Sequence, residues 1–118
     1  MFGLGALPGI ESLIEMIHAV SGWDISVDEM LVVGERIANI RQAFNVREGL
    51  NPLKYNVPGR IIGVPPKSAG PTKGVTVDEQ TLERDYLAAM DWDLINAKPS
   101  KGKLLALGLD DVARVLWP

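Results

Sequence analysis

The feature that most constrains the fold is one long amphipathic segment that begins at Ser26 and ends near Gly49. Ser26 and Glu29 are typical of a capping box, in which each side chain binds the other residue's backbone N–H at the start of a helix. Apolar residues then recur at three- and four-residue steps, namely Met30, Val33, Ile37, Ile40 and Phe44. This spacing predicts a helix from about Val27 to Arg47 whose buried face ends at Phe44. Gly34 and Ala38 beside that face indicate either a close packing contact or simple tolerance of a glycine.

The same signals predict shorter helices on either side. One runs from about Gly9 to Ser21, where Gly22 supplies a C-terminal stop. A second covers about Asp78 to Met90 and begins with a capping box of Thr76 and Glu79. Its buried face is expected to contain Leu82, Tyr86 and Ala89.

Two more helices are predicted near the C-terminus. One covers Ser100 to Leu107 and is ended by Gly108, and the other begins at Asp110 and Asp111. The last helix bears Val112, Val115 and Leu116.

A long segment without periodicity separates the helices. Residues Leu50 to Val75 contain five of the eight prolines and four of the glycines, which argues against both a helix and a paired central strand. Crossings of this length usually carry function or lie across another surface. We therefore predict one domain over residues 1–118, a small all-α multihelical orthogonal bundle with one long irregular proline- and glycine-rich crossing.

Composition excludes several classes of function. The net charge is −3 and the basic residues are scattered from Arg36 to Arg114, so nucleic acid is not expected as a partner. No run of 18 consecutive apolar residues and no basic leader is present, which predicts a cytoplasmic protein with no membrane partner. The chain has no cysteine, so it cannot supply thiolate ligands, a cysteine nucleophile or its own iron–sulfur ligation.

No motif in the chain predicts a catalytic, cofactor-binding or metal-binding residue. The start GLGALPG lacks the strand and the acid of a dinucleotide site, and GPTKG at Gly70 to Gly74 is expected to be a plain turn. His18 with Glu11 and Glu15 is expected to lie on a solvated helix face.

The stretch NVREG, Asn45 to Gly49, lies at the end of the long helix and is the one motif that helix packing does not fully explain. Gly49 is expected to stop the helix, and Arg47 to contact the exposed carbonyls of its last turn. This interpretation leaves Asn45, Arg47 and Glu48 as candidate contacts with something outside the domain.

Several stretches together resemble, in order and spacing, the C-terminal helical domain of the tungsten-containing aldehyde:ferredoxin oxidoreductases. They are GWDIS, VGERIANIRQAFNVREG, PGR at Pro58 to Arg60, PTKG at Pro71 to Gly74, LERDYLAAMDWD and KLLALGLDDV. The resemblance covers about Leu13 to Val112, and its most specific part runs from Gly34 to Gly49. Met90 and Asp91 depart from the arginine and glycine that precede Trp-Asp in relatives.

The resemblance implies an enzyme that oxidises aldehydes to carboxylates at a tungsten or molybdenum atom held by two pterins. Electrons would pass through a 4Fe-4S cluster to ferredoxin. The family's pterin segments and cluster cysteines lie in earlier domains, so no position here inherits a metal, cluster or catalytic role. We expect this chain, a fragment or a small subunit, to be inactive alone and to close over the upstream cofactor domains, with an exposed apolar face that allows self-association. The alternative is an autonomous helical interaction module without enzymatic activity.

Overall fold

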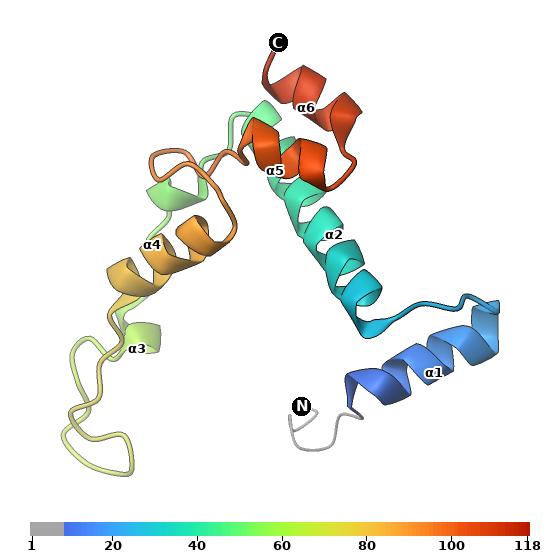
Figure 1. Ribbon diagram of the computed structural model, residues 1–118. Coiled ribbons are helices and arrows are strands. Elements are labelled where there is room, and N and C mark those ends of the chain that lie inside the picture. Colours follow the sequence, from blue (N-terminus) through green and yellow to red (C-terminus); the bar gives the residue numbers. More distant parts are fainter. Residues whose placement is uncertain (1–8) are drawn as a thin grey trace. The chain divides into compact units, whose positions relative to one another are not determined.

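The computed structural model describes residues 9–118 as helices joined by turns and loops, with no β-strand in that range (Figure 1). The predicted all-α class is therefore confirmed. The chain divides into two compact units, Met1–Ala38 and Asn39–Pro118. Most of the GLGALPG pattern lies outside the described residues.

The first unit contains α1 (Ile10–Ser21) and the start of α2 (Val27–Arg47). Helix α1 ends where Gly22 adopts a left-handed conformation at φ 72° and donates its N–H to the His18 carbonyl at 2.7 Å. Both helices lie within about one residue of their predicted bounds, because their stop and cap signals are local. A Cβ placed on Gly34 would meet no atom within 4 Å, so the described residues provide no close packing partner there.

The predicted capping box at the start of α2 is confirmed. The Ser26 hydroxyl accepts the Glu29 N–H at 3.2 Å, and the Glu29 carboxylate accepts the Ser26 N–H at 2.8 Å. The backbone N–H of Ser26, followed by its hydroxyl, lowers the pKa of Glu29 because both hydrogen bonds favour the ionised form.

The second capping box was predicted at the wrong residue. Helix α4 spans Glu79–Ala89, and Asp78 rather than Thr76 is its N-cap. The Asp78 carboxylate accepts the Thr81 N–H at 3.1 Å and the Thr81 hydroxyl at 2.7 Å. These bonds, with the side-chain one the larger, lower the pKa of Asp78. The Asp78 carboxylate accepts both hydrogen bonds from Thr81 at once. It therefore caps the helix in place of the predicted box at Thr76, two residues earlier.

The C-terminal part of the second unit holds most of the core. It includes α5 (Lys101–Ala106) and α6 (Asp110–Leu116), both close to their predicted bounds. The buried apolar side chains of this unit are Ala43, Leu87, Ala97, Leu104, Leu107, Ala113 and Leu116. The predicted buried faces are largely wrong: Ile40, Phe44, Leu82 and Tyr86 are exposed. The periodicity located apolar stripes correctly, but the described chain does not cover them.

Polar side chains instead fill the buried face of α2 in this unit. Asn39 is fully buried and accepts the indole N–H of Trp92 at 2.9 Å. Gln42, also buried, donates its amide to the Ala97 carbonyl at 2.9 Å. The Trp92 ring also meets Tyr86 edge-on, with 5.7 Å between ring centroids. These bonds tie α2 to the turn between α4 and α5.

The proline-rich crossing is more ordered than its sequence predicts. It contains a 3₁₀ turn, η2 (Pro52–Lys54), and a short helix, α3 (Gly59–Ile62). Asn51 starts η2 by accepting the Leu53 N–H at 3.0 Å, and Gly63 ends α3 at φ 77°. Each of these two elements spans only about one turn, so it has too few residues for a periodic pattern to predict it. The GPTKG stretch is a turn, as predicted, with the Lys73 N–H donated to the Gly70 carbonyl at 3.0 Å.

Candidate docking site

The end of α2 forms a complete backbone cap around Gly49. The Gly49 N–H donates to the Val46 carbonyl at 3.0 Å, and the Leu50 N–H donates to the Asn45 carbonyl at 2.8 Å. Gly49 is left-handed at φ 79°, which is the conformation a Schellman cap requires. The predicted stop at Gly49 is confirmed, and the carbonyls of Phe44, Asn45 and Val46 all accept backbone N–H groups.

Arg47 therefore does not have the role expected at the helix end. Its guanidinium pairs with the Glu48 carboxylate at 2.8 Å, and both side chains are about half exposed. The same guanidinium lies over the Phe44 ring, 5.0 Å from its centroid. Because the backbone cap already occupies the carbonyls, Arg47 is oriented by its neighbours into a surface cluster with Phe44 and Glu48.

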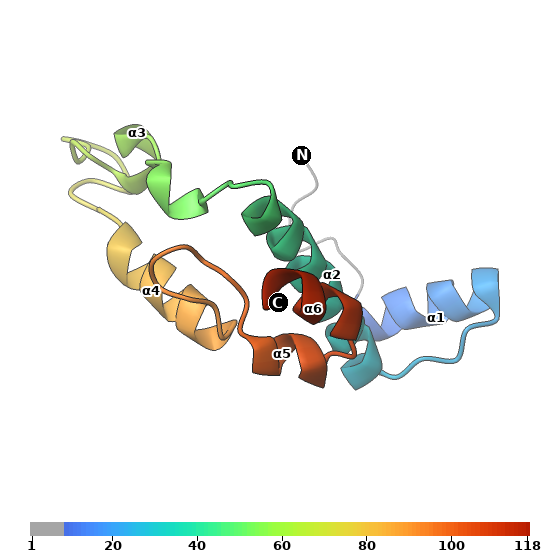
Figure 2. The same ribbon diagram turned by 90° about the horizontal axis from the view of Figure 1, so that it is seen from above.

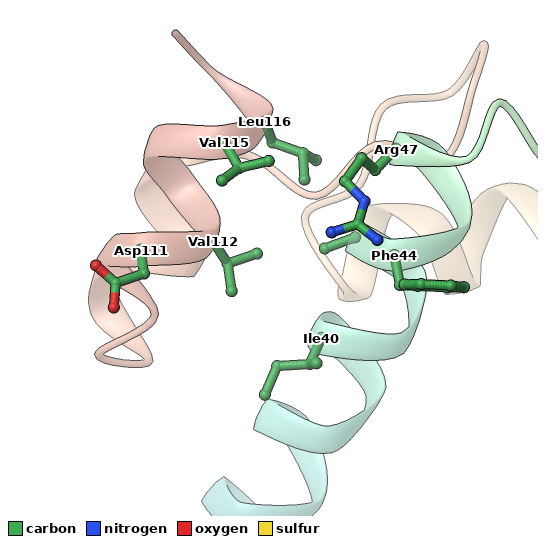
Figure 3. Close-up of a pocket in the computed structure, with 8 residues that line it drawn as sticks. Ile40, Phe44, Arg47, Asp111, Val112, Val115 and Leu116 are labelled. Atoms are coloured by element: carbon green, nitrogen blue, oxygen red, sulfur yellow. The ribbon is translucent and has the colours of Figure 1, made fainter.

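This cluster stands at one end of an apolar groove between α2 and α6. In two views α6 lies beside the C-terminal end of α2 (Figures 1 and 2). The groove has a volume of about 260 Å³. It is lined by Ile40, Ala43, Phe44 and Arg47 of α2 and by Asp111, Val112, Val115 and Leu116 of α6. Figure 3 shows Ile40, Val112 and Leu116 directed toward the space between the helices.

Charge is confined to the edges of the groove. Asp111 points away from α2 in Figure 3 and pairs with Arg114 one turn along α6. At the other end Arg47 is paired with Glu48. The walls between them are apolar, so the groove is suited to an apolar side chain from a partner protein.

The structure brings together only part of the sequence-predicted site. Arg47 lines the groove, and Glu48, which does not line it, forms an ion pair with Arg47. Asn45 is half-buried and does not line the groove. Sequence reasoning missed Ile40, Val112 and Val115 as site residues because apolar stripes on two helices predict a core. Only the structure shows that Ile40 and Val115 are exposed and that Val112 is partly exposed beside them.

The donor groups of the chain do not fit a resident metal cofactor. Within residues 9–118, no three histidine, aspartate or glutamate side chains lie close enough together to hold a metal ion, and the sequence contains no cysteine. None of the described helices is long and apolar enough to cross a membrane.

Comparison with known proteins decides the family. Residues 3–109 match the family model described as aldehyde ferredoxin oxidoreductase, domains 2 and 3. The chain belongs to the aldehyde ferredoxin oxidoreductase family. It corresponds to a C-terminal part of these enzymes.

The similar proteins include several named tungsten-containing aldehyde ferredoxin oxidoreductase. The Pyrococcus horikoshii protein is 36% identical over 93% of this chain, and the Pyrococcus abyssi protein is 34% identical over 93%. The Thermococcus kodakarensis protein is 36% identical over 77%. The chain spans only 17% of the length of the two Pyrococcus relatives. No solved structure matches the chain significantly.

Proposed function

We propose that this chain is the C-terminal domain of an aldehyde-oxidising enzyme and that it packs against the cofactor-bearing part of that enzyme. The observation that carries the proposal is the exposed apolar groove with the surface cluster of Phe44, Arg47 and Glu48 at its end. Burying such a groove against another domain is favourable at about 25 cal/mol per Å² of apolar surface. The whole enzyme would oxidise an aldehyde to a carboxylate at a tungsten or molybdenum pterin and deliver electrons through an iron–sulfur cluster to ferredoxin.

Within this proposal the chain has a structural role. It has no cysteine for the cluster, so cluster ligands come from other domains. Residues 1–118 act as one domain that closes over the cofactors, with Asn45, Arg47 and Glu48 contacting the neighbouring domain. The proposal also includes a cytoplasmic location, which rests on the sequence pattern.

The test is reconstitution from two pieces. The chain is produced separately and mixed with the remaining domains of its enzyme, or with the corresponding piece of the Pyrococcus horikoshii relative. We expect a stable complex by gel filtration, and aldehyde-dependent reduction of a viologen dye by the complex but not by the chain alone. Iron bound by the chain alone, or no association with the other piece, would overturn the proposal and favour the independent interaction module.

Matched variants locate the contact. Val115 in the groove is 59% exposed and Leu82 on α4 is 60% exposed, so lysine at either position should be equally harmless to the isolated chain. Val115→Lys should abolish association because it places a charge in the apolar contact, whereas Leu82→Lys should leave association intact. Arg47→Ala and Glu48→Ala should each weaken it. Equal effects of the two lysine substitutions would refute the groove as the docking site.

A further inference from the structure

A second surface, which shares no residue with the groove, lies in the segment from Leu50 to Val77. This segment contains Lys54, Arg60, Lys67 and Lys73 but no aspartate or glutamate, although the whole chain has a net charge of −3. Within the described part of the chain, no carboxylate forms an ion pair with any of these cations. The segment therefore carries four positive charges that no acid within it compensates.

The backbone holds two of these cations side by side. Lys67 and Lys73 pair across the turn between them, and the Gly74 N–H donates to the Lys67 carbonyl at 3.0 Å. Like charges placed opposite each other are unfavourable. A binding partner that brings carboxylates to this pair would complement both charges.

Two of these cations, Arg60 and Lys67, line a largely apolar hollow, which we call the α3 hollow, with a volume of about 660 Å³. Its lining combines Arg60, Lys67 and Thr72 with Ile61, Ile62, Gly63, Val64, Pro65, Val75 and Val77. Ile61 is 72% exposed. Four aliphatic side chains that border solvent beside two cations form a mixed surface of the kind found in protein interfaces.

The walls of the hollow are fixed by specific contacts. The Val77 N–H donates to the Ile62 carbonyl at 2.8 Å, which joins the two ends of the loop. A Cβ on Gly63 would lie 2.4 Å from the Val75 carbonyl oxygen, so only glycine allows this approach. The hollow therefore belongs to a closed loop whose backbone is fixed at its neck.

We propose that the α3 hollow binds a carboxylate-rich protein segment, with one apolar side chain of that segment entering the hollow. Carboxylates complement Arg60, Lys67 and Lys73, and charge complementarity of this kind increases association rates and selects partners. A nucleic acid fits less well, because the lining has no aromatic side chain for base stacking and the chain as a whole is acidic. This inference does not depend on the proposed enzyme function.

The test uses a fluorescently labelled glutamate-rich peptide with one central leucine and the intact chain. Anisotropy at low salt should show binding that weakens as salt is added. The variant Arg60→Gln/Lys67→Gln/Lys73→Gln should bind at least about tenfold more weakly, because three exposed ion pairs are lost. The control Arg41→Gln/Lys101→Gln removes two exposed cations from outside the segment and should bind nearly as wild type does.

Further probes separate the possible binding modes. Replacing the central leucine of the peptide with serine should weaken binding if a side chain enters the hollow. Amide chemical shifts of wild-type protein should change mainly at residues 60–77, which provides a readout even if a variant unfolds. Shifts elsewhere, no binding by the peptide, equal loss in the control variant, or stronger binding of a DNA oligonucleotide of equal charge would each overturn the proposal.

Discussion

Replacing the buried Asn39 tests whether a polar contact, rather than the apolar stripe, ties the C-terminal part of α2 to the turn between α4 and α5. Asn39 is 0% exposed and its Oδ1 accepts the Trp92 indole N–H at 2.9 Å. Asn39→Ala leaves that donor without its acceptor, at a cost of about 1–3 kcal/mol. Alanine returns roughly 0.5 kcal/mol of helix propensity, so the free energy of unfolding should fall by about 0.5–2.5 kcal/mol.

The assay is urea unfolding at neutral pH, followed by far-UV circular dichroism. A double-mutant cycle with Trp92→Phe isolates the hydrogen bond: once the indole N–H is gone, Asn39→Ala should cost about 1 kcal/mol less. The exposed Arg41 on the same helix is the control, and Arg41→Ala should change stability by less than about 0.5 kcal/mol. An equal cost of Asn39→Ala in both backgrounds would refute the reasoning.

The remaining predictions concern the core, the helix caps and the stop of α2. Leu104→Ala should lower the free energy of unfolding by about 2–5 kcal/mol because the side chain is fully buried. Phe44→Ala should lower it by about 1 kcal/mol or less, because Phe44 is 54% exposed. Urea unfolding compares the two variants, and the reverse order would show that Phe44 belongs to the core. Lowered pKa values of Glu29 and Asp78 mean that their stabilisation is present above the ordinary carboxyl pKa of about 4 and is lost as pH falls through the lowered value. Glu29→Gln/Asp78→Asn should therefore flatten the acid side of the stability profile, and an unchanged profile would contradict this. Gly49→Ala should lower stability by about 1 kcal/mol through backbone strain alone, since φ is 79° and a Cβ there meets no atom; a neutral result in thermal unfolding would contradict the cap.

The sequence alone predicted features whose physics is local. The Ser26 and Glu29 box involves residues three apart, and the Gly49 stop involves one left-handed residue and its neighbours. Helix bounds therefore agreed to within about one residue. The capping residue of α4 was the exception, because Asp78 and Thr76 both offer a cap and a carboxylate accepts more bonds.

Burial required the tertiary structure. Periodicity places Ile40 and Phe44 on one face of α2, but it cannot show whether another element of the chain covers that face. In the second unit Asn39 and Gln42 face the core, where they bind Trp92 and the Ala97 carbonyl. The sequence pattern did not predict this, because both partners lie more than 50 residues away in sequence. The groove also depends on tertiary packing, because its two walls, α2 and α6, are far apart in the sequence. The sequence predicts the apolar stripe on each helix, but only the folded structure shows that the two stripes lie next to each other.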